Sequence, residues 1–155
     1  MPYRICKAFR VENAHMLMKH PEKCKYPHGH SRKVDVMLSG DALDGADMLC
    51  DFKAVKLAVG EFLDTFDHAI CVNSNDPFLA SLKTLPGARL IVYSETDPTT
   101  EVMVKHIFEH IKAAIAKDIT YSTPDGKATY VIGKNVQLER VRLWETADSW
   151  AEYWE

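Results

Sequence analysis

Apolar and polar residues alternate in two stretches near the N-terminus. The first stretch covers residues 3–11, and its alternate positions carry Tyr3, Ile5, Lys7, Phe9 and Val11. A period of two is typical of a half-buried strand, so we predict a strand here that ends near His15. A second strand is expected from about His30 to Ser39, where one parity carries His28, His30, Val34, Val36 and Leu38. Alternate residues of a strand share a face, so both histidines are expected on the buried face, with a site at its rim.

From Asp51 the apolar positions follow a helical period instead. They are Phe52, Val55, Val59, Phe62, Leu63 and Phe66. Asp51 is a favourable N-cap residue, and we predict that this helix ends near Asp67 and His68. A second helix is expected to start within residues 97–101, with Pro98 in its first turn. Its apolar stripe consists of Met103, Ile107, Ile111, Ala114 and Ile115.

The remaining segments complete a single α+β domain over residues 1–155. A long connection spans 71–96 and contains a candidate short helix at 76–79 and a candidate strand at 90–93. Two or three further strands are predicted around 128–132, 136–145 and 150–153. The order strand, strand, helix, helix, strand, strand predicts an antiparallel sheet with helices on one face. Because such an open sheet has unpaired edges, we expect an oligomer that pairs them.

Composition and charge narrow the function classes. Hydrophobic residues make up 46% and charged residues 26% of the 155 residues, which is typical of one globular domain. The formal net charge of -3 argues against a nucleic-acid binder. No apolar run approaches the roughly 20 residues of a membrane span, and the N-terminal residues lack the apolar core of a signal peptide. We therefore expect a cytoplasmic protein without a membrane partner.

The four cysteines differ in their surroundings. None forms a Cys-x-x-Cys pair, which argues against a zinc finger, and in a reducing compartment free thiols are expected. Cys6, Cys50 and Cys71 lie among apolar residues and are predicted to be small buried hydrophobes. Cys24 lies in a polar loop flanked by lysines, a setting compatible with a lowered thiol pKa.

Three histidines and this thiol form the strongest candidate site. His28 and His30 are separated by one glycine, so in a strand both rings reach the same face. His15 stands at the end of the preceding strand. Neutral imidazole is the usual nitrogen ligand of zinc, and three protein ligands leave a fourth position open. The pattern therefore predicts a catalytic zinc site with Cys24 as a reactive group beside it.

Other candidate residues have two interpretations each. The pair Asp67–His68 is either a general-base arrangement or a polar helix end. Glu145 is either an inward carboxylate that holds a ring with amide-like donors or a charged strand end. His106 and His110 match the His-x-x-Glu-His signature of inverted zincins, but we expect them to face solvent at the edge of their helix.

Six segments in this order resemble one family, the 6-pyruvoyltetrahydropterin and 6-carboxytetrahydropterin synthases. They are Phe9–His15, Cys24-x-x-x-His28-Gly29-His30, Gly45–Phe52, Asp67–His68, Pro98–Glu101 and Glu145–Thr146. The resemblance implies the tunnelling fold, with a four-stranded antiparallel sheet and two helices between its second and third strands. It also implies trimers stacked into hexamers, with active sites between subunits.

The resemblance also implies a role for each matching residue. Zinc would be held by His15, His28 and His30. Cys24 would be the base that moves protons on the substrate side chain, with Asp67 and His68 supporting it from a neighbouring subunit. Glu145 would anchor the pterin ring, in a pocket lined by Thr99, Thr100 and Glu101.

The three-residue gap between Cys24 and His28 is similar to that of the carboxy, queuosine-pathway branch. That branch implies conversion of 7,8-dihydroneopterin triphosphate to 6-carboxy-5,6,7,8-tetrahydropterin, with release of acetaldehyde and triphosphate. The alternatives are elimination of triphosphate to the pyruvoyl product, and a non-catalytic pterin- or purine-binding oligomer that retains zinc. Asn13, Phe66, the long connection 71–96 and an insert at 118–133 depart from the family pattern, and they leave a related pterin reaction open.

Overall fold

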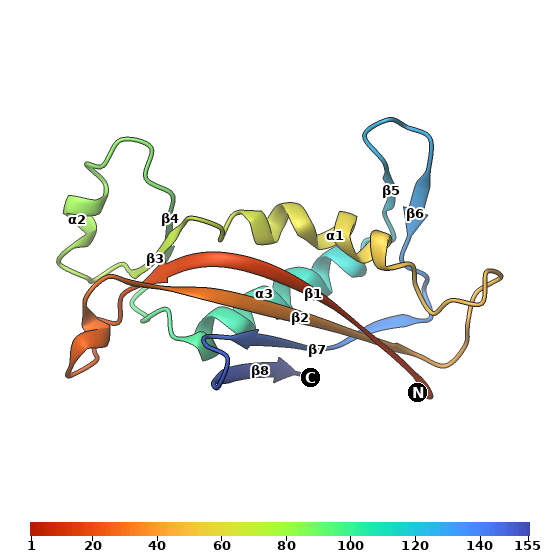
Figure 1. The fold of residues 1–155 in the computed structure, drawn as a ribbon, viewed down its shortest axis with the longest axis horizontal. Coiled ribbons are helices and arrows are strands. Elements are labelled where there is room, and N and C mark those ends of the chain that lie inside the picture. The colour runs from red at the N-terminus through yellow and green to blue at the C-terminus, as the bar shows by residue number, and fades with distance from the viewer.

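The computed structural model describes all residues, 1–155 (Figure 1). The strands are β1 (Tyr3–His15), β2 (His28–Gly40), β3 (Ile70–Asn73), β4 (Leu90–Tyr93), β5 (Thr120–Ser122), β6 (Thr129–Val131), β7 (Val136–Trp144) and β8 (Trp150–Trp154). The helices are α1 (Phe52–Asp64), α2 (Leu79–Leu82) and α3 (Thr100–Ile115), and a 3-10 turn covers Lys23–Lys25.

Six strands form the main sheet, in the order β4-β3-β1-β2-β7-β8. Its four long neighbours β1, β2, β7 and β8 pair antiparallel, and α1 and α3 lie between β2 and β7 in the chain. The α+β class is therefore confirmed, although the sheet is larger than the four strands expected. β3 and β4 pair with each other in parallel and extend the sheet beyond β1. On its other side β3 pairs with the last two residues of β1, Ala14 and His15. The connection after α1 thus satisfies backbone groups at the site end of β1.

One face of the sheet is covered by α1 and α3, and the core lies between this face and the two helices (Figure 1). The inner face of β2 contributes Val34, Val36 and Leu38, each at most 1% exposed. The parity predicted for the second strand is therefore confirmed. α1 and α3 contribute the residues of their predicted stripes, including Val55, Val59, Leu63, Met103, Ile107 and Ile111.

The outer face of the sheet carries no helix and is mostly polar. Ion pairs cross it, such as Arg4 with Glu139 and Arg142 with Glu152. Cys6 points to this face and is exposed, so its predicted burial is wrong, whereas Cys50 and Cys71 are buried as predicted. The error has a simple cause, because Cys6 has the opposite parity to the inward residues of β1.

The helix ends differ from the prediction by a few residues. Asp51 caps α1 as expected, and its carboxylate accepts from the amide of Lys53. α1 ends at Asp64 rather than near Asp67, and Thr99, not a residue before it, caps α3. The insert at 118–133 forms the hairpin β5–β6, which rises beside α1 in Figure 1. None of the helices combines the length and apolar character needed to cross a membrane.

Truncating Leu38 in this core should destabilise the protein. The side chain is fully buried, and a Leu→Ala change at such a position costs about 2–5 kcal/mol of unfolding free energy, from lost burial and the cavity left behind. Leu38→Ala is compared with Leu85→Ala, whose side chain is 52% exposed, by urea unfolding. Equal midpoints for both variants would contradict the assigned inner face of β2.

Candidate metal centre

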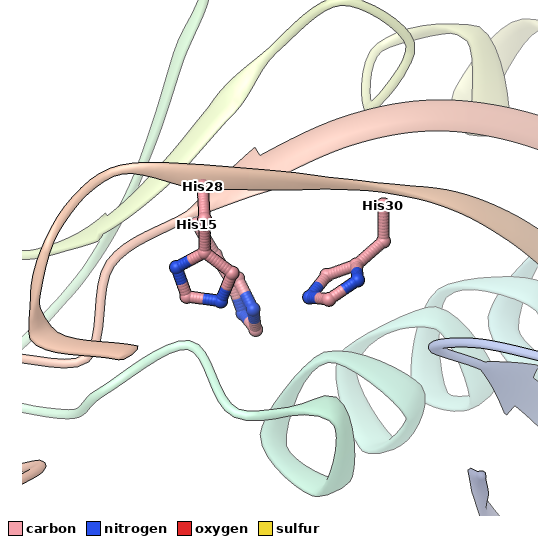
Figure 2. A group of neighbouring side chains, drawn as sticks. All are labelled: His15, His28 and His30. Carbon is pink, nitrogen blue, oxygen red and sulfur yellow. The ribbon is translucent and has the colours of Figure 1, made fainter. Parts of the chain in front are cut away.

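Three imidazoles converge where β1 and β2 meet. His15 pairs with His28 in the strand register, and His30 lies two residues further along β2 on the same face. Figure 2 shows the three rings pointing into one space, next to the start of α3. The ring centroids are 4.5–5.2 Å apart. One nitrogen from each ring lies within 4.8 Å of the others, so the three side chains can share one ion.

Backbone carbonyls orient two of these rings. Nδ1 of His15 lies 2.9 Å from the carbonyl oxygen of Pro98, and Nδ1 of His28 lies 2.8 Å from that of Tyr26. A carbonyl can only accept a hydrogen bond, so each Nδ1 carries the proton and donates it. Each Nε2 is left with a free lone pair, the arrangement found in metal-binding histidines.

The third ring carries an unsatisfied nitrogen. Nε2 of His30 is buried and has no hydrogen-bond partner, and a bound metal would satisfy it. Burial lowers the pKa of His15 to about 4 and also lowers the pKa of His30. Both rings are therefore neutral at pH 7, which is the form that coordinates a metal. The donor set fits zinc, since three imidazoles leave one position of a tetrahedron open.

A carboxylate stands beside these rings. Glu145, which follows β7, has Oε1 3.5 Å from Nε2 of His30. The hydroxyl of Thr100 donates to Oε2 of the same carboxylate. Burial by itself raises the pKa of Glu145, but the Thr100 hydrogen bond, His30 and Arg32 together lower it below its ordinary value. Glu145 is therefore an ionised acceptor next to the candidate ligands.

Arg32 is a site residue that the sequence analysis missed. Its side chain is 1% exposed, and its guanidinium donates from Nη1 to the Thr100 hydroxyl at 3.1 Å. Nη1 also lies 3.9 Å from Oε2 of Glu145. Its position in the strand could have indicated this role, because Arg32 lies between His30 and Val34 on the inward face of β2. A charged residue within a buried stripe requires a partner.

The other predicted pocket residues occupy different positions. The Thr99 hydroxyl accepts from the amide of Val102 and caps α3. Glu101, in the first turn of the helix, is exposed. Of the three residues, only Thr100 contacts Glu145 within this chain.

Asp67 and His68 form a pair that β1 holds in place. Oδ2 of Asp67 accepts from Nδ1 of His68 at 2.7 Å, and Oδ1 accepts from the amide of Glu12. The Glu12 and His68 hydrogen bonds lower the pKa of Asp67. The amide nitrogen of Asn13's side chain donates to the carbonyl of Phe66 at 2.9 Å. The two residues that depart from the family pattern thus contact each other, and together they anchor this turn.

The His68 side chain lies at a hollow in the protein surface. It is 74% exposed, and it lines a cavity of about 350 Å³ together with Glu12 and His30, among others. A second cavity of about 620 Å³ also has His30 in its lining, with Lys33, Trp144 and Glu145. Cavities of this size are typical of small-molecule sites.

Cys24 does not join the cluster within one chain. It lies in the 3-10 turn Lys23–Lys25 and is half-buried, and its carbonyl accepts from the amide of Leu17. Its Sγ is not among the potential ligand atoms that lie within 4.8 Å of one another. The thiol is near the metal centre in sequence, but no hydrogen bond joins it to the three rings.

His106 and His110 do not form a metal site. Nδ1 of His106 lies 2.9 Å from the hydroxyl of Tyr93, and the ring is half-buried, so its predicted exposure is wrong. His110 is exposed as predicted, but its ring stacks on Phe62 with centroids 3.5 Å apart. Glu109 pairs with Lys105. The helical spacing of these residues therefore serves packing against neighbouring aromatic rings.

Comparisons with known proteins show which chains this one is similar to. A family model described as 6-pyruvoyl tetrahydropterin synthase matches residues 4–155. A 6-carboxy-5,6,7,8-tetrahydropterin synthase of Aquifex aeolicus is 31% identical over 171 residues, covering 99% of this chain and 98% of that protein. Its counterpart in Haemophilus influenzae is 30% identical and covers 99% of each. The 6-pyruvoyl tetrahydropterin synthase structure of Caenorhabditis elegans, at 21% identity, covers 99% of this chain and 95% of that one with a TM-score of 0.64.

Proposed function

The chain belongs to the 6-pyruvoyl tetrahydropterin synthase family, and on that premise we propose that it is a zinc-dependent pterin lyase. The proposed reaction converts 7,8-dihydroneopterin triphosphate to 6-carboxy-5,6,7,8-tetrahydropterin, a step of queuosine biosynthesis. One carbon of the substrate side chain stays as the carboxyl group, and the other two leave as acetaldehyde together with triphosphate. The reaction consumes one water molecule, which supplies the third oxygen that the carboxyl group and the aldehyde need beyond the two side-chain hydroxyls. Two relatives of 30–31% identity that carry the carboxytetrahydropterin name support this choice.

The observation that carries the proposal is the convergence of three imidazoles beside an ionised carboxylate that lies 3.5 Å from one of them. His15, His28 and His30 would hold the zinc, which would satisfy the unpartnered Nε2 of His30. When bound, zinc would act as a Lewis acid that makes the carbon-bound protons beside the substrate hydroxyls easier to remove.

Glu145 would bind the other end of the substrate. A pterin ring offers an N–H and an amino group on one edge, and a carboxylate accepts from both in a charge-assisted contact. Because Glu145 lies beside His30, a ring held there would direct its side chain toward the three histidines. Thr100 holds the carboxylate in place through its hydroxyl.

Cys24 would be the base that takes a proton from the substrate side chain, and Asp67 would orient His68 to exchange protons with it. Neither group belongs to the cluster of ligand atoms within one chain: Cys24 is not among the side chains whose ligand atoms lie within 4.8 Å of one another, and His68 is exposed. The outer edge of β8 and most of the outer edge of β1 also lack a strand partner. We therefore include in the proposal a homo-oligomer, a trimer or hexamer, whose sites form between subunits.

The second candidate function is elimination of triphosphate to the pyruvoyl product. It is supported by the family model's own description and uses the same residues.

A cytoplasmic location is also part of the proposal, supported by four cysteines that are all free.

Metal content should separate the histidine cluster from the other histidine pair. Replacing His28 removes one of three ligands, so His28→Ala is expected to lose most of its bound zinc, about 100-fold in affinity or more. His106→Ala should keep the zinc content of the parent protein. Zinc content is measured by elemental analysis of both purified variants. Loss of zinc in His106→Ala but not in His28→Ala would instead support the inverted-zincin interpretation of His106 and His110.

Product analysis should identify the reaction. With 7,8-dihydroneopterin triphosphate, the protein is expected to release acetaldehyde, measured by coupled reduction to ethanol. Cys24→Ala should lower turnover by about 100-fold or more, the usual worth of a general base. Cys6→Ala, which removes an exposed thiol from the outer face of the sheet, is the matched control. Triphosphate release without acetaldehyde would favour the pyruvoyl product, and unchanged turnover in Cys24→Ala would exclude its role as base.

Mixing two inactive variants should reveal whether sites lie between subunits. Cys24→Ala and His68→Ala are each expected to be nearly inactive. In mixed oligomers some interfaces unite an intact Cys24 with an intact His68 from the next subunit, so part of the activity should return. Each variant dissociated and reassembled alone is the control. Mixed oligomers that stay inactive would place both residues in the same site of one chain.

A further inference from the structure

Arg32 has the largest fully buried side chain in the molecule. Removing a guanidinium from water is costly unless a carboxylate and hydrogen bonds compensate it. The compensation here is incomplete, because Nε of Arg32 is buried without a partner. A buried group held at such a cost calls for an explanation.

Only one carboxylate forms an ion pair with this guanidinium. That carboxylate is Glu145, with Oε2 3.9 Å from Nη1. The other polar groups nearby are the Thr100 hydroxyl, the His15 ring, Cys71 and Tyr93. Burial raises the pKa of Cys71 to about 11 and raises that of Tyr93. Both are therefore uncharged at pH 7, and Glu145 is the only negative partner.

The contacts reach only one of the two carboxylate oxygens. Nη1 of Arg32 donates to the Thr100 hydroxyl, and that hydroxyl donates to Oε2 of Glu145. Oε1 receives nothing from Arg32 or Thr100 and faces His30. The carboxylate is thus fixed through one lone pair of Oε2, which leaves Oε1 and the second lone pair of Oε2 available to the two donors of a ligand.

The same guanidinium contacts a candidate metal ligand. Nη2 lies 3.3 Å from Nδ1 and 3.4 Å from Nε2 of His15. Nearly equal distances to both nitrogens place Nη2 over the face of the ring, since an in-plane position would collide with the carbon between them. Arg32 therefore packs against the ring that Pro98 orients and leaves its Nε2 lone pair free.

We propose that Arg32 is a positioning residue that sets the ring specificity of the site, by holding the Glu145 carboxylate through Thr100 so that Oε1 faces the ligand. The proposal rests on the pterin-binding role given to Glu145 above. A carboxylate fixed in this way selects rings that present two donors on one edge, as a 2-amino-4-oxopteridine does. A 2,4-dioxopteridine presents a carbonyl in place of the amino group and is repelled.

Ligand discrimination tests this role. The probes are 7,8-dihydroneopterin and its 2-oxo counterpart, with dissociation constants measured by calorimetry on the zinc-loaded protein. The parent protein should prefer the amino compound by about 100-fold, since a missing donor leaves a buried charged acceptor unpaired. Arg32→Met, of similar length but neutral, should lower affinity for the amino compound about tenfold or more and leave the 2-oxo compound nearly unchanged.

Three further variants sharpen the comparison. Arg32→Lys keeps the charge with a single nitrogen and should recover part of the preference. Arg142→Met removes another strand arginine, paired with Glu152 rather than Glu145, and should retain the full preference. Thr100→Val removes the hydroxyl that links Arg32 to Glu145 and should reduce the preference even if Arg32→Met does not fold.

The outcomes separate this inference from the proposed function. A parent protein that binds neither probe would overturn the pterin assignment itself. A parent protein that prefers the amino compound, with the same preference in Arg32→Met or in Thr100→Val, would overturn the role of Arg32 alone. Equal weakening of both probes would show a merely structural role and would also overturn it.

Discussion

The antiparallel pairing of β1 with β2 is the constraint on which the rest of the structure depends. It runs without interruption from Tyr3 opposite Gly40 to His15 opposite His28. A shift of either strand by one residue would move its inward side chains to the outer face. Val34, Val36 and Leu38 anchor the register by their burial, and the histidines share their parity. The same packing that stabilises the core therefore also brings the three imidazoles together.

At the site end of the sheet, polar groups from distant segments compensate one another. The start of α3 supplies the Pro98 carbonyl and the Thr100 hydroxyl, and the end of β7 leads into Glu145. A carboxylate near a helix N-terminus is also favoured by the helix dipole. Arg32 contacts the Thr100 hydroxyl, the Glu145 carboxylate and the His15 ring. Three imidazole rings, one anion and one buried cation thus lie close together and share hydrogen bonds and ion pairs.

Much of this arrangement could be predicted from local patterns. The periods of two and of about three and a half identified the long strands and both long helices, and Asp51 was identified as a cap. The failures have equally local causes. Cys6 was assigned by its apolar neighbours rather than by its parity, and β3 is too short to show a period. His106 seemed exposed because its contacts, Tyr93 and Phe62, come from other segments.

The sequence by itself determined which side chains share a face: the histidines of β2 with the core, and the apolar stripes of α1 and α3. Such relations follow from backbone geometry over a few residues. Only the tertiary structure decided that Arg32 joins Thr100 and Glu145, which the family resemblance had already implied to share a pocket, because Arg32 and Thr100 are 68 residues apart in the chain. Contacts over that distance are set by how the packed faces fit together, and no local period records them.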